Sequence, residues 1–181
     1  MKKYYKMGIK ILFVLVIVFG ILGTGLQAQG TLFIFYDTEC PICQKSSARL
    51  QEMYAKFGQN VAFKAVFPTK SIKKSAIRQF SKEYNFTLPY VIDKTHSLVE
   101  LYDAKTTPEV VLLDKNGAEI YRGAIDNQFF GLGKYRPQTT EFYLQNALEA
   151  LISNRPVTQS RTEAVGCLIN RKKKESVKQS L

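Results

Sequence analysis

The apolar positions of the chain alternate between short strand-like runs and helical repeats. Residues 31–36 form a nearly continuous run of apolar and β-prone side chains, which is typical of a strand buried on both faces. Apolar residues then recur at helical spacing over residues 43–57. The next segments predict a second strand at 61–67 and a second helix at 71–84. The first half of the chain therefore has the order strand, helix, strand, helix.

The second half of the chain predicts a β-hairpin followed by a helix. The predicted elements are a short extended piece from Pro89, one or two helical turns over 96–103, a strand over 110–113 and a returning strand over 118–125. Between those two strands, Asp114-Lys-Asn-Gly117 has the composition of a tight turn. Residues 126–138 are expected to form a loop, and a last helix is expected to start near Thr139 or Thr140. This order predicts an α/β fold with a central mixed β-sheet flanked by helices.

The first 28 residues have the pattern of an export signal. Four lysines lie within the first ten residues, an apolar run covers 11–22, and Leu26-Gln-Ala28 places a small residue just before a cleavage point. The apolar run is shorter than the ~20 residues that a membrane span needs. An uncleaved membrane anchor over residues 9–26 is the alternative. We therefore expect an exported chain with a periplasmic or other extracytoplasmic location.

The net charge of the chain is concentrated at its two ends. The 181 residues carry a formal charge of +11, from 26 Lys and Arg against 15 Asp and Glu. The signal supplies four of these charges and the stretch 171–178 a net four, so residues 29–170 carry only about +3. A nearly balanced domain without a recognised nucleic-acid motif argues against nucleic-acid binding.

Two cysteines at a predicted strand-to-helix junction carry the most specific chemistry. They lie in Tyr36-Asp-Thr-Glu-Cys40-Pro-Ile-Cys43. Unpaired N–H groups and the macrodipole at a helix start stabilise a thiolate, and Pro41 suits the first helical turn. The spacing lets Cys43 resolve a mixed disulfide formed at Cys40. We therefore predict a redox-active Cys40–Cys43 disulfide, with Cys40 as the exposed attacking thiol and Cys43 as the more buried resolving thiol.

Other uses of the Cys-x-x-Cys pair are less well supported. A zinc site would need four ligands, and only Cys167 and His96 remain to complete one. Covalent haem attachment needs a histidine after the second cysteine, where this chain has Gln44. A purely structural disulfide would close so short a loop that it would stabilise rather little. We therefore expect no metal and no cofactor, since no nicotinamide or flavin fingerprint occurs, and electrons would come from a partner protein.

Several motifs resemble those of a known superfamily. They are Cys40-Pro-Ile-Cys43, Thr107-Pro108, Tyr121-Arg-Gly-Ala-Ile-Asp126 and Gly166-Cys167-Leu-Ile169. In this order, over roughly residues 31–169, they resemble the thioredoxin-like superfamily and, more closely, exported redoxin-domain proteins related to alkyl hydroperoxide reductase and thiol-specific antioxidant. The resemblance implies a thioredoxin-like fold. It also implies a cis proline at 108 that packs against the cysteine pair and, with Thr107, shapes the substrate groove.

These patterns together divide the chain into three parts. We expect a signal peptide or N-terminal anchor over 1–28, a thioredoxin-like redoxin domain over 29–156, and an extension over 157–181 that carries Cys167 and the basic tail. Cys167 is either a third redox thiol that exchanges with the pair or a small buried apolar residue. Both interpretations stay open at this point.

The predicted function is that of an exported thiol:disulfide oxidoreductase acting on disulfide-bearing or dithiol partner proteins. One alternative is a thiol peroxidase with an antioxidant role. A peroxidatic cysteine is expected to have a proline seven residues before it and a threonine or serine three residues before it. The corresponding residues for Cys40 are Phe33 and Asp37, so the peroxidase alternative is weakened. A copper-binding or assembly module using the same thiols is a further alternative, but it lacks a convincing histidine setting.

Three further residues or segments are candidates of less specific chemistry. His96 is expected to be a loop or helix residue rather than a base. Arg122 and the loop Phe129–Tyr135 either line a partner surface or, more simply, form a surface loop packed by its own aromatic side chains.

Overall fold

The computed structural model describes residues 28–171, and its elements follow the predicted order. The helices of this region are α2 (Pro41–Phe57), α3 (Lys74–Glu83), α4 (Ser97–Leu101) and α5 (Tyr143–Ile152). The strands are β1 (Gly30–Phe35), β2 (Val61–Phe67), β3 (Tyr90–Ile92), β4 (Thr106–Thr107), β5 (Glu109–Asp114), β6 (Glu119–Gly123), β7 (Phe129–Gly131), β8 (Lys134–Tyr135) and β9 (Cys167–Leu168).

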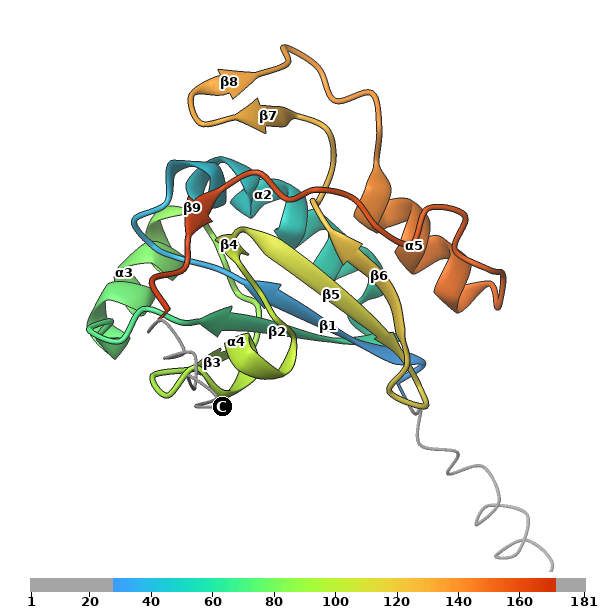
Figure 1. Cartoon of the computed structure of the whole chain (residues 1–181), viewed down its shortest axis with the longest axis horizontal. Helices are drawn as coiled ribbons and strands as arrows, with labels where there is room; N and C mark the ends of the chain where they lie inside the picture. Colours follow the sequence, from blue (N-terminus) through green and yellow to red (C-terminus); the bar gives the residue numbers. More distant parts are fainter. Residues whose placement is uncertain (1–27, 172–181) are drawn as a thin grey trace, which may run out of the picture.

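Five of these strands form one mixed sheet in the order β3-β2-β1-β5-β6 (Figure 1). Strands β1, β2 and β3 run parallel, whereas β5 is antiparallel to β1 and β6 is antiparallel to β5. In the middle of the sheet, Ile34 is opposite Ala65 on one side and Val110 on the other. The predicted α/β class and the central mixed sheet are confirmed.

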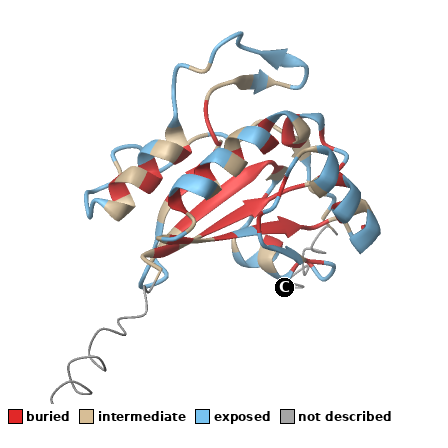
Figure 2. Ribbon diagram, turned by 180° about the vertical axis from the view of Figure 1, so that it is seen from behind, coloured by how far each residue is buried: buried red, intermediate tan, exposed pale blue. Residues whose placement is uncertain are grey.

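The helices cover both faces of the sheet, so its central strands β1 and β5 are buried on both sides, whereas the edge strand β3 is largely exposed. Successive side chains of β1 point to opposite faces, as the period of two requires. The face beneath α2, α3 and α5 contains Leu32, Ile34, Leu50, Ile77 and Leu144. The face beneath α4 contains Phe33, Phe35, Val66, Val99 and Val111. Figure 2 shows the buried strands between helices whose outer faces are exposed.

The segment between β6 and α5 differs from the prediction. Residues 126–138, expected to be a loop, contain the β7–β8 hairpin, which stands out from the rest of the molecule in Figure 1. The helix expected from Thr139 or Thr140 begins at Tyr143. The side-chain oxygen of Asn127 accepts hydrogen bonds from the backbone N–H groups of Thr140 and Glu141, at 3.0 and 3.1 Å. These residues are thereby tied to the preceding loop and not to the helix.

The chain after α5 returns across the molecule to the end of the sheet near α2 (Figure 1). There β9 pairs with β4 in a separate two-stranded sheet that the sequence pattern did not predict. No helix within residues 28–171 is long and apolar enough to cross a bilayer. The predicted signal or anchor, apart from its last residue, and most of the basic tail lie outside the described residues.

Candidate functional site

The Cys-x-x-Cys motif lies at the junction of β1 and α2. Cys40 has an extended backbone, with φ −79° and ψ 117°, and Pro41 is the first residue of the helix. The Cys40 carbonyl accepts the first hydrogen bond of the helix, from the N–H of Gln44 at 3.0 Å. Both sulfurs are therefore at the helix N-terminus, where unpaired N–H groups and the macrodipole favour negative charge.

Tyr36 fixes the first turn of α2 against the sheet. Its buried hydroxyl donates to the Cys43 carbonyl and lies 3.0 Å from the Ser47 hydroxyl. Its ring stacks on Phe86, with centroids 5.0 Å apart. Burial raises the pKa of Tyr36 well above its usual value, so the phenol keeps its proton and remains a donor. Sequence reasoning missed this residue, although an aromatic with a polar end directly before the motif was a usable signal.

The Thr107–Pro108 peptide bond is cis, as the resemblance implied. It brings the backbone of β4 against the cysteine pair. The Cys40 Sγ lies 3.1 Å from the Thr107 carbonyl oxygen, to which the thiol donates when it is protonated. Two segments 67 residues apart in the chain thus meet at one sulfur atom.

The two sulfurs of the pair have opposite protonation preferences. A hydrogen bond from the Cys43 thiol, with a smaller one from Cys167, lowers the pKa of Cys40 to about 5 despite its burial. Burial raises the pKa of Cys43 well above its usual value, and the neighbouring Cys40 raises it further. At neutral pH this arrangement gives a thiolate at Cys40 beside a protonated Cys43. Such a pair has one thiolate that acts as the nucleophile and one protonated thiol that can act later as the resolving group.

Cys167 completes a group of three thiols. Strand β9 pairs antiparallel to β4, with Cys167 opposite Thr107, and the Sγ atoms of Cys167 and Cys40 are 2.7 Å apart. Burial, followed by the effect of Cys40, raises the pKa of Cys167 to about 12. The residue is only partly buried and packs at the edge of the core. The structure therefore brings all three cysteines of the chain to one site, with each in the free thiol form.

One expectation about this site is wrong. Cys40, predicted to be the exposed attacking thiol, is only 2% exposed. The segment 160–171, here named the C-terminal strap, lies against this sulfur: it brings Cys167 onto Cys40, and its strand β9 pairs antiparallel with β4 (Figure 1). Cys43 is also buried, as predicted.

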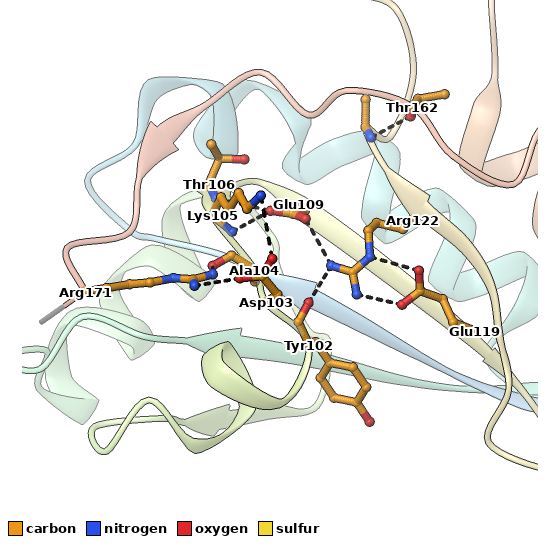
Figure 3. A network of polar contacts seen from close by, with 11 residues as sticks. Tyr102, Asp103, Ala104, Lys105, Thr106, Glu109, Glu119, Arg122, Thr162 and Arg171 are labelled. Atoms are coloured by element: carbon orange, nitrogen blue, oxygen red, sulfur yellow. Dashed lines mark hydrogen bonds and ion pairs between the residues drawn. The ribbon is translucent and has the colours of Figure 1, made fainter. Parts of the chain in front are cut away.

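His96 and Arg122 each bind groups other than the sulfur atoms, and His96 lines a cavity of about 290 Å³ together with Cys167. His96 precedes α4 in a left-handed conformation, φ 62°, and its Nε2 lies 2.8 Å from the Pro68 carbonyl oxygen. Arg122 is only 9% exposed and binds Glu119, Glu109 and the Tyr102 carbonyl (Figure 3). Its guanidinium is thus directed into the molecule and not toward a partner.

The Phe129–Tyr135 segment packs on itself only in part. The rings of Phe129 and Tyr135 have centroids 6.4 Å apart across the β7–β8 hairpin, and Phe129 packs against the core. Phe130, Leu132 and Tyr135 are each more than half exposed, so both interpretations of this segment stay open. As to metals, no cluster of three or more His, Cys, Asp or Glu side chains suited to an ion occurs between residues 28 and 171.

Comparison with known proteins finds relatives that are named thiol-disulfide oxidoreductases. The chain is 24% identical to the thiol-disulfide oxidoreductase ResA of Halalkalibacterium halodurans over 106 residues, 57% of this chain and 59% of that protein. It is 24% identical to a ResA of Bacillus cereus over 120 residues, 66% of this chain and 64% of that protein. The chain thus spans about three fifths of the length of these relatives.

Solved structures show the same architecture. A crystal structure of an uncharacterized conserved protein from Geobacillus kaustophilus has a TM-score of 0.68 at 25% identity, covering 84% of this chain and 82% of that one. A hypothetical protein from Sinorhizobium meliloti 1021 also has a TM-score of 0.68, at 24% identity, covering 84% and 85%. A thioredoxin-like protein in its oxidized form, with a TM-score of 0.55 at 16% identity over 71% and 81%, shares the fold.

The model of the AhpC/TSA family matches residues 24–121, which is more than half of the chain and includes the Cys-x-x-Cys junction and the cis proline. The predicted thioredoxin-like fold is confirmed by the topology of the sheet and by these neighbours. Because the match covers more than half of the chain and includes β1, α2 and β4, which position Cys40, Cys43 and the cis proline, the chain belongs to the AhpC/TSA family of thioredoxin-like redoxins.

Proposed function

We propose that this chain is a thiol-disulfide oxidoreductase that exchanges disulfides with partner proteins through Cys40 and Cys43. The observation that carries the proposal is the placement of a Cys-x-x-Cys pair at the start of α2, with Cys40 Sγ 3.1 Å from the carbonyl oxygen before the cis proline. The likeness to ResA proteins, which are named thiol-disulfide oxidoreductases, supports the same activity.

The reaction uses the unequal acidities of the two thiols. The Cys40 thiolate attacks one sulfur of the partner's disulfide, a Cys40–partner bond forms, and the second partner sulfur leaves as a thiolate. Cys43 then loses its proton and attacks the Cys40 sulfur. The Cys40–Cys43 disulfide forms, and the first partner sulfur leaves. The partner gains two electrons and the pair loses them.

The segment before the cis proline is the proposed contact surface for the partner. Thr107 presents its carbonyl to Cys40, and its hydroxyl lies 3.4 Å from the Cys167 carbonyl, to which it donates. With Pro108 it forms the wall beside the reacting sulfur. In this structure β9 occupies the backbone edge of β4, and an extended peptide can pair with that edge by strand addition in its place.

Export of the protein belongs to the same proposal. The lysine-rich start and the apolar run of residues 11–22 support a signal or an anchor, and a working domain over 29–156 with an extension over 157–181. An extracytoplasmic location would provide the disulfide-bearing or dithiol partner proteins that this chemistry needs, because disulfides persist in oxidising compartments.

Disulfide reduction by the residue 29–181 form is the direct test. Insulin-disulfide reduction is measured for the wild type and for Cys40→Ser and Cys43→Ser. We expect Cys40→Ser to lose activity, and Cys43→Ser to accumulate mixed disulfides because the resolving thiol is gone. Peroxide consumption and copper(I) retention are measured on the same samples. Peroxide turnover without disulfide exchange would overturn the proposal in favour of a thiol peroxidase, and activity that survives Cys40→Ser would remove the assigned nucleophile.

A further inference from the structure

The Cys40 sulfur has two thiol neighbours on different elements. Cys43 belongs to the same helix, whereas Cys167 belongs to the C-terminal strap, 127 residues further along the chain. The Sγ atoms of Cys167 and Cys40 are 2.7 Å apart. Either neighbour can therefore form a disulfide with Cys40, and the two disulfides exclude each other because they share one sulfur.

The strap is seated on β4 by a close backbone contact. A Cβ atom added to Gly166 would lie 2.1 Å from the Thr107 carbonyl oxygen, a distance that real Cβ atoms do not show. Glycine is thus required here for the strap to reach Cys40. The N–H of Ile169 donates to the Lys105 carbonyl at 2.9 Å, and Arg171 binds Asp103 at 2.8 Å and the Ala104 carbonyl (Figure 3).

Other features of the strap indicate that it can detach from β4. Its pairing with β4 spans only two residues on each strand. Leu168, in the middle of the contact, is 82% exposed. Cavities of about 290 and about 610 Å³ flank it on its two sides, and both include Leu168 in their lining. The apolar contacts that hold it are those of Val165, Cys167 and Ile169, which are only partly buried at the margins of the two core clusters, so its departure exposes little fully buried surface.

We propose that the C-terminal strap is a thiol latch: Cys167 forms an alternative disulfide with Cys40, which closes the site, and partner proteins reach Cys40 only when the strap leaves β4. This inference rests on the proposed function, since it adds a second internal partner to the same reactive sulfur. It also explains why the predicted nucleophile is only 2% exposed.

The exchange between the two disulfides is balanced and needs no added oxidant. Starting from Cys40–Cys43, the Cys167 thiolate attacks the Cys40 sulfur. The Cys40–Cys167 bond forms, the Cys40–Cys43 bond breaks, and Cys43 leaves as a thiolate that takes up the proton given up by Cys167. The charge of Cys40 is one reason why the pKa of Cys167 is high. That charge is absent once Cys40 is in a disulfide, so Cys167 becomes easier to ionise when the exchange requires it.

Disulfide mapping by mass spectrometry tests the latch. The reduced full chain is oxidised with a limiting amount of diamide, quenched in acid and digested. We expect two linked species, one with Cys40 joined to Cys43 and one with Cys40 joined to Cys167. Wild-type protein that contains only the Cys40–Cys43 link would overturn the inference.

Gly166→Ala separates the latch from the chemistry of the pair, because it keeps all three thiols and obstructs only the seat of the strap. We expect the Cys40–Cys167 link to be lost and insulin reduction to rise by about threefold or more, since a closed fraction lowers the apparent activity in proportion. The matched control is Leu168→Ala, a neighbouring exposed position, which should match the wild type. A wild-type share of the Cys40–Cys167 link in Gly166→Ala would contradict the proposal.

Cys167→Ser provides a second variant with an almost unchanged strap. It should show only the Cys40–Cys43 link and reduce insulin faster than the wild type, and an unchanged or lower rate would count against a closing role. The two proposals fail separately. Absence of the Cys40–Cys167 link from the oxidised wild type, with insulin reduction present, removes the latch alone. Formation of that link in a wild type that does not reduce insulin removes the proposed function alone.

Discussion

The Cys40 sulfur lies among groups from three separate parts of the chain. The Cys43 thiol comes from the same helix, the Thr107 carbonyl from β4 and the Cys167 thiol from β9. Two of the three are donors toward a negative sulfur. They outweigh the burial that by itself would keep the thiol protonated, so the pKa of Cys40 falls to about 5.

This acidity predicts the pH dependence of Cys40 alkylation. A thiolate is lost as the pH falls through its pKa, so the rate with iodoacetamide should be level at neutral pH and fall with a midpoint near 5. Site-resolved mass spectrometry of the reduced protein measures this profile. Cys167→Ala removes one donor and should move the midpoint upward. A wild-type midpoint near the ~8.5 of a free thiol would contradict the assigned environment.

At the scale of the site, the sequence pointed to residues that the structure brings together, but it did not indicate their accessibility. The Cys-x-x-Cys motif and Thr107-Pro108 are local signals, and both appear where the pattern placed them. The cover over Cys40 depends on a pairing of two-residue strands, β4 and β9. Strands of two residues are too short to show an alternation of apolar and polar positions. The paired residues Thr107 and Cys167 are also 60 residues apart in the chain, so no local pattern could predict this pairing.

At the scale of elements, long periodic segments were predictable and polar contacts were not. The sheet and α2 follow from apolar runs that bury whole faces. The start of α5 depends on the side-chain oxygen of Asn127, which accepts the Thr140 N–H, and the orientation of Arg122 depends on Glu109 across the β5–β6 pair. Such contacts join specific atoms and leave no periodic signature in the sequence.

The ion pair across β5 and β6 gives a prediction about stability. Arg122→Ala leaves the buried carboxylate of Glu109 without its cation, and removing one partner of a buried pair typically costs about 3 kcal/mol or more. The free energy of unfolding in urea should fall by that amount. Glu119→Gln, which alters the more exposed partner, should cost under about 1 kcal/mol. If the free energy of unfolding fell equally in Arg122→Ala and Glu119→Gln, the different burial of Glu109 and Glu119 would have no effect on their contributions to stability.

At the scale of the whole molecule, the segment after α5 is bound to the edge of the sheet. The N–H of Arg122 donates to the Ser160 carbonyl, and the N–H of Thr162 donates to the Arg122 carbonyl, both at 2.9 Å. The Thr162 hydroxyl contacts the Tyr121 hydroxyl at 2.7 Å and accepts the Ala124 N–H at 2.9 Å. The extension predicted from residue 157 thus connects β6 to the cysteine site.

A chain that ends at Pro156 tests what this connection contributes. Removing the residues after Pro156 eliminates two backbone hydrogen bonds and the Thr162 contacts, each worth about 1 kcal/mol. It also uncovers the apolar surface beneath Val157 and Val165. We expect the free energy of unfolding in urea to fall by about 3 kcal/mol and Cys40 to be alkylated faster. A chain that ends at Arg171 is the control, because it keeps every contact described here and should behave as the full chain. If the shorter chain matched it in both measurements, the extension would neither support β6 nor cover Cys40, and the latch would lose the segment that carries it.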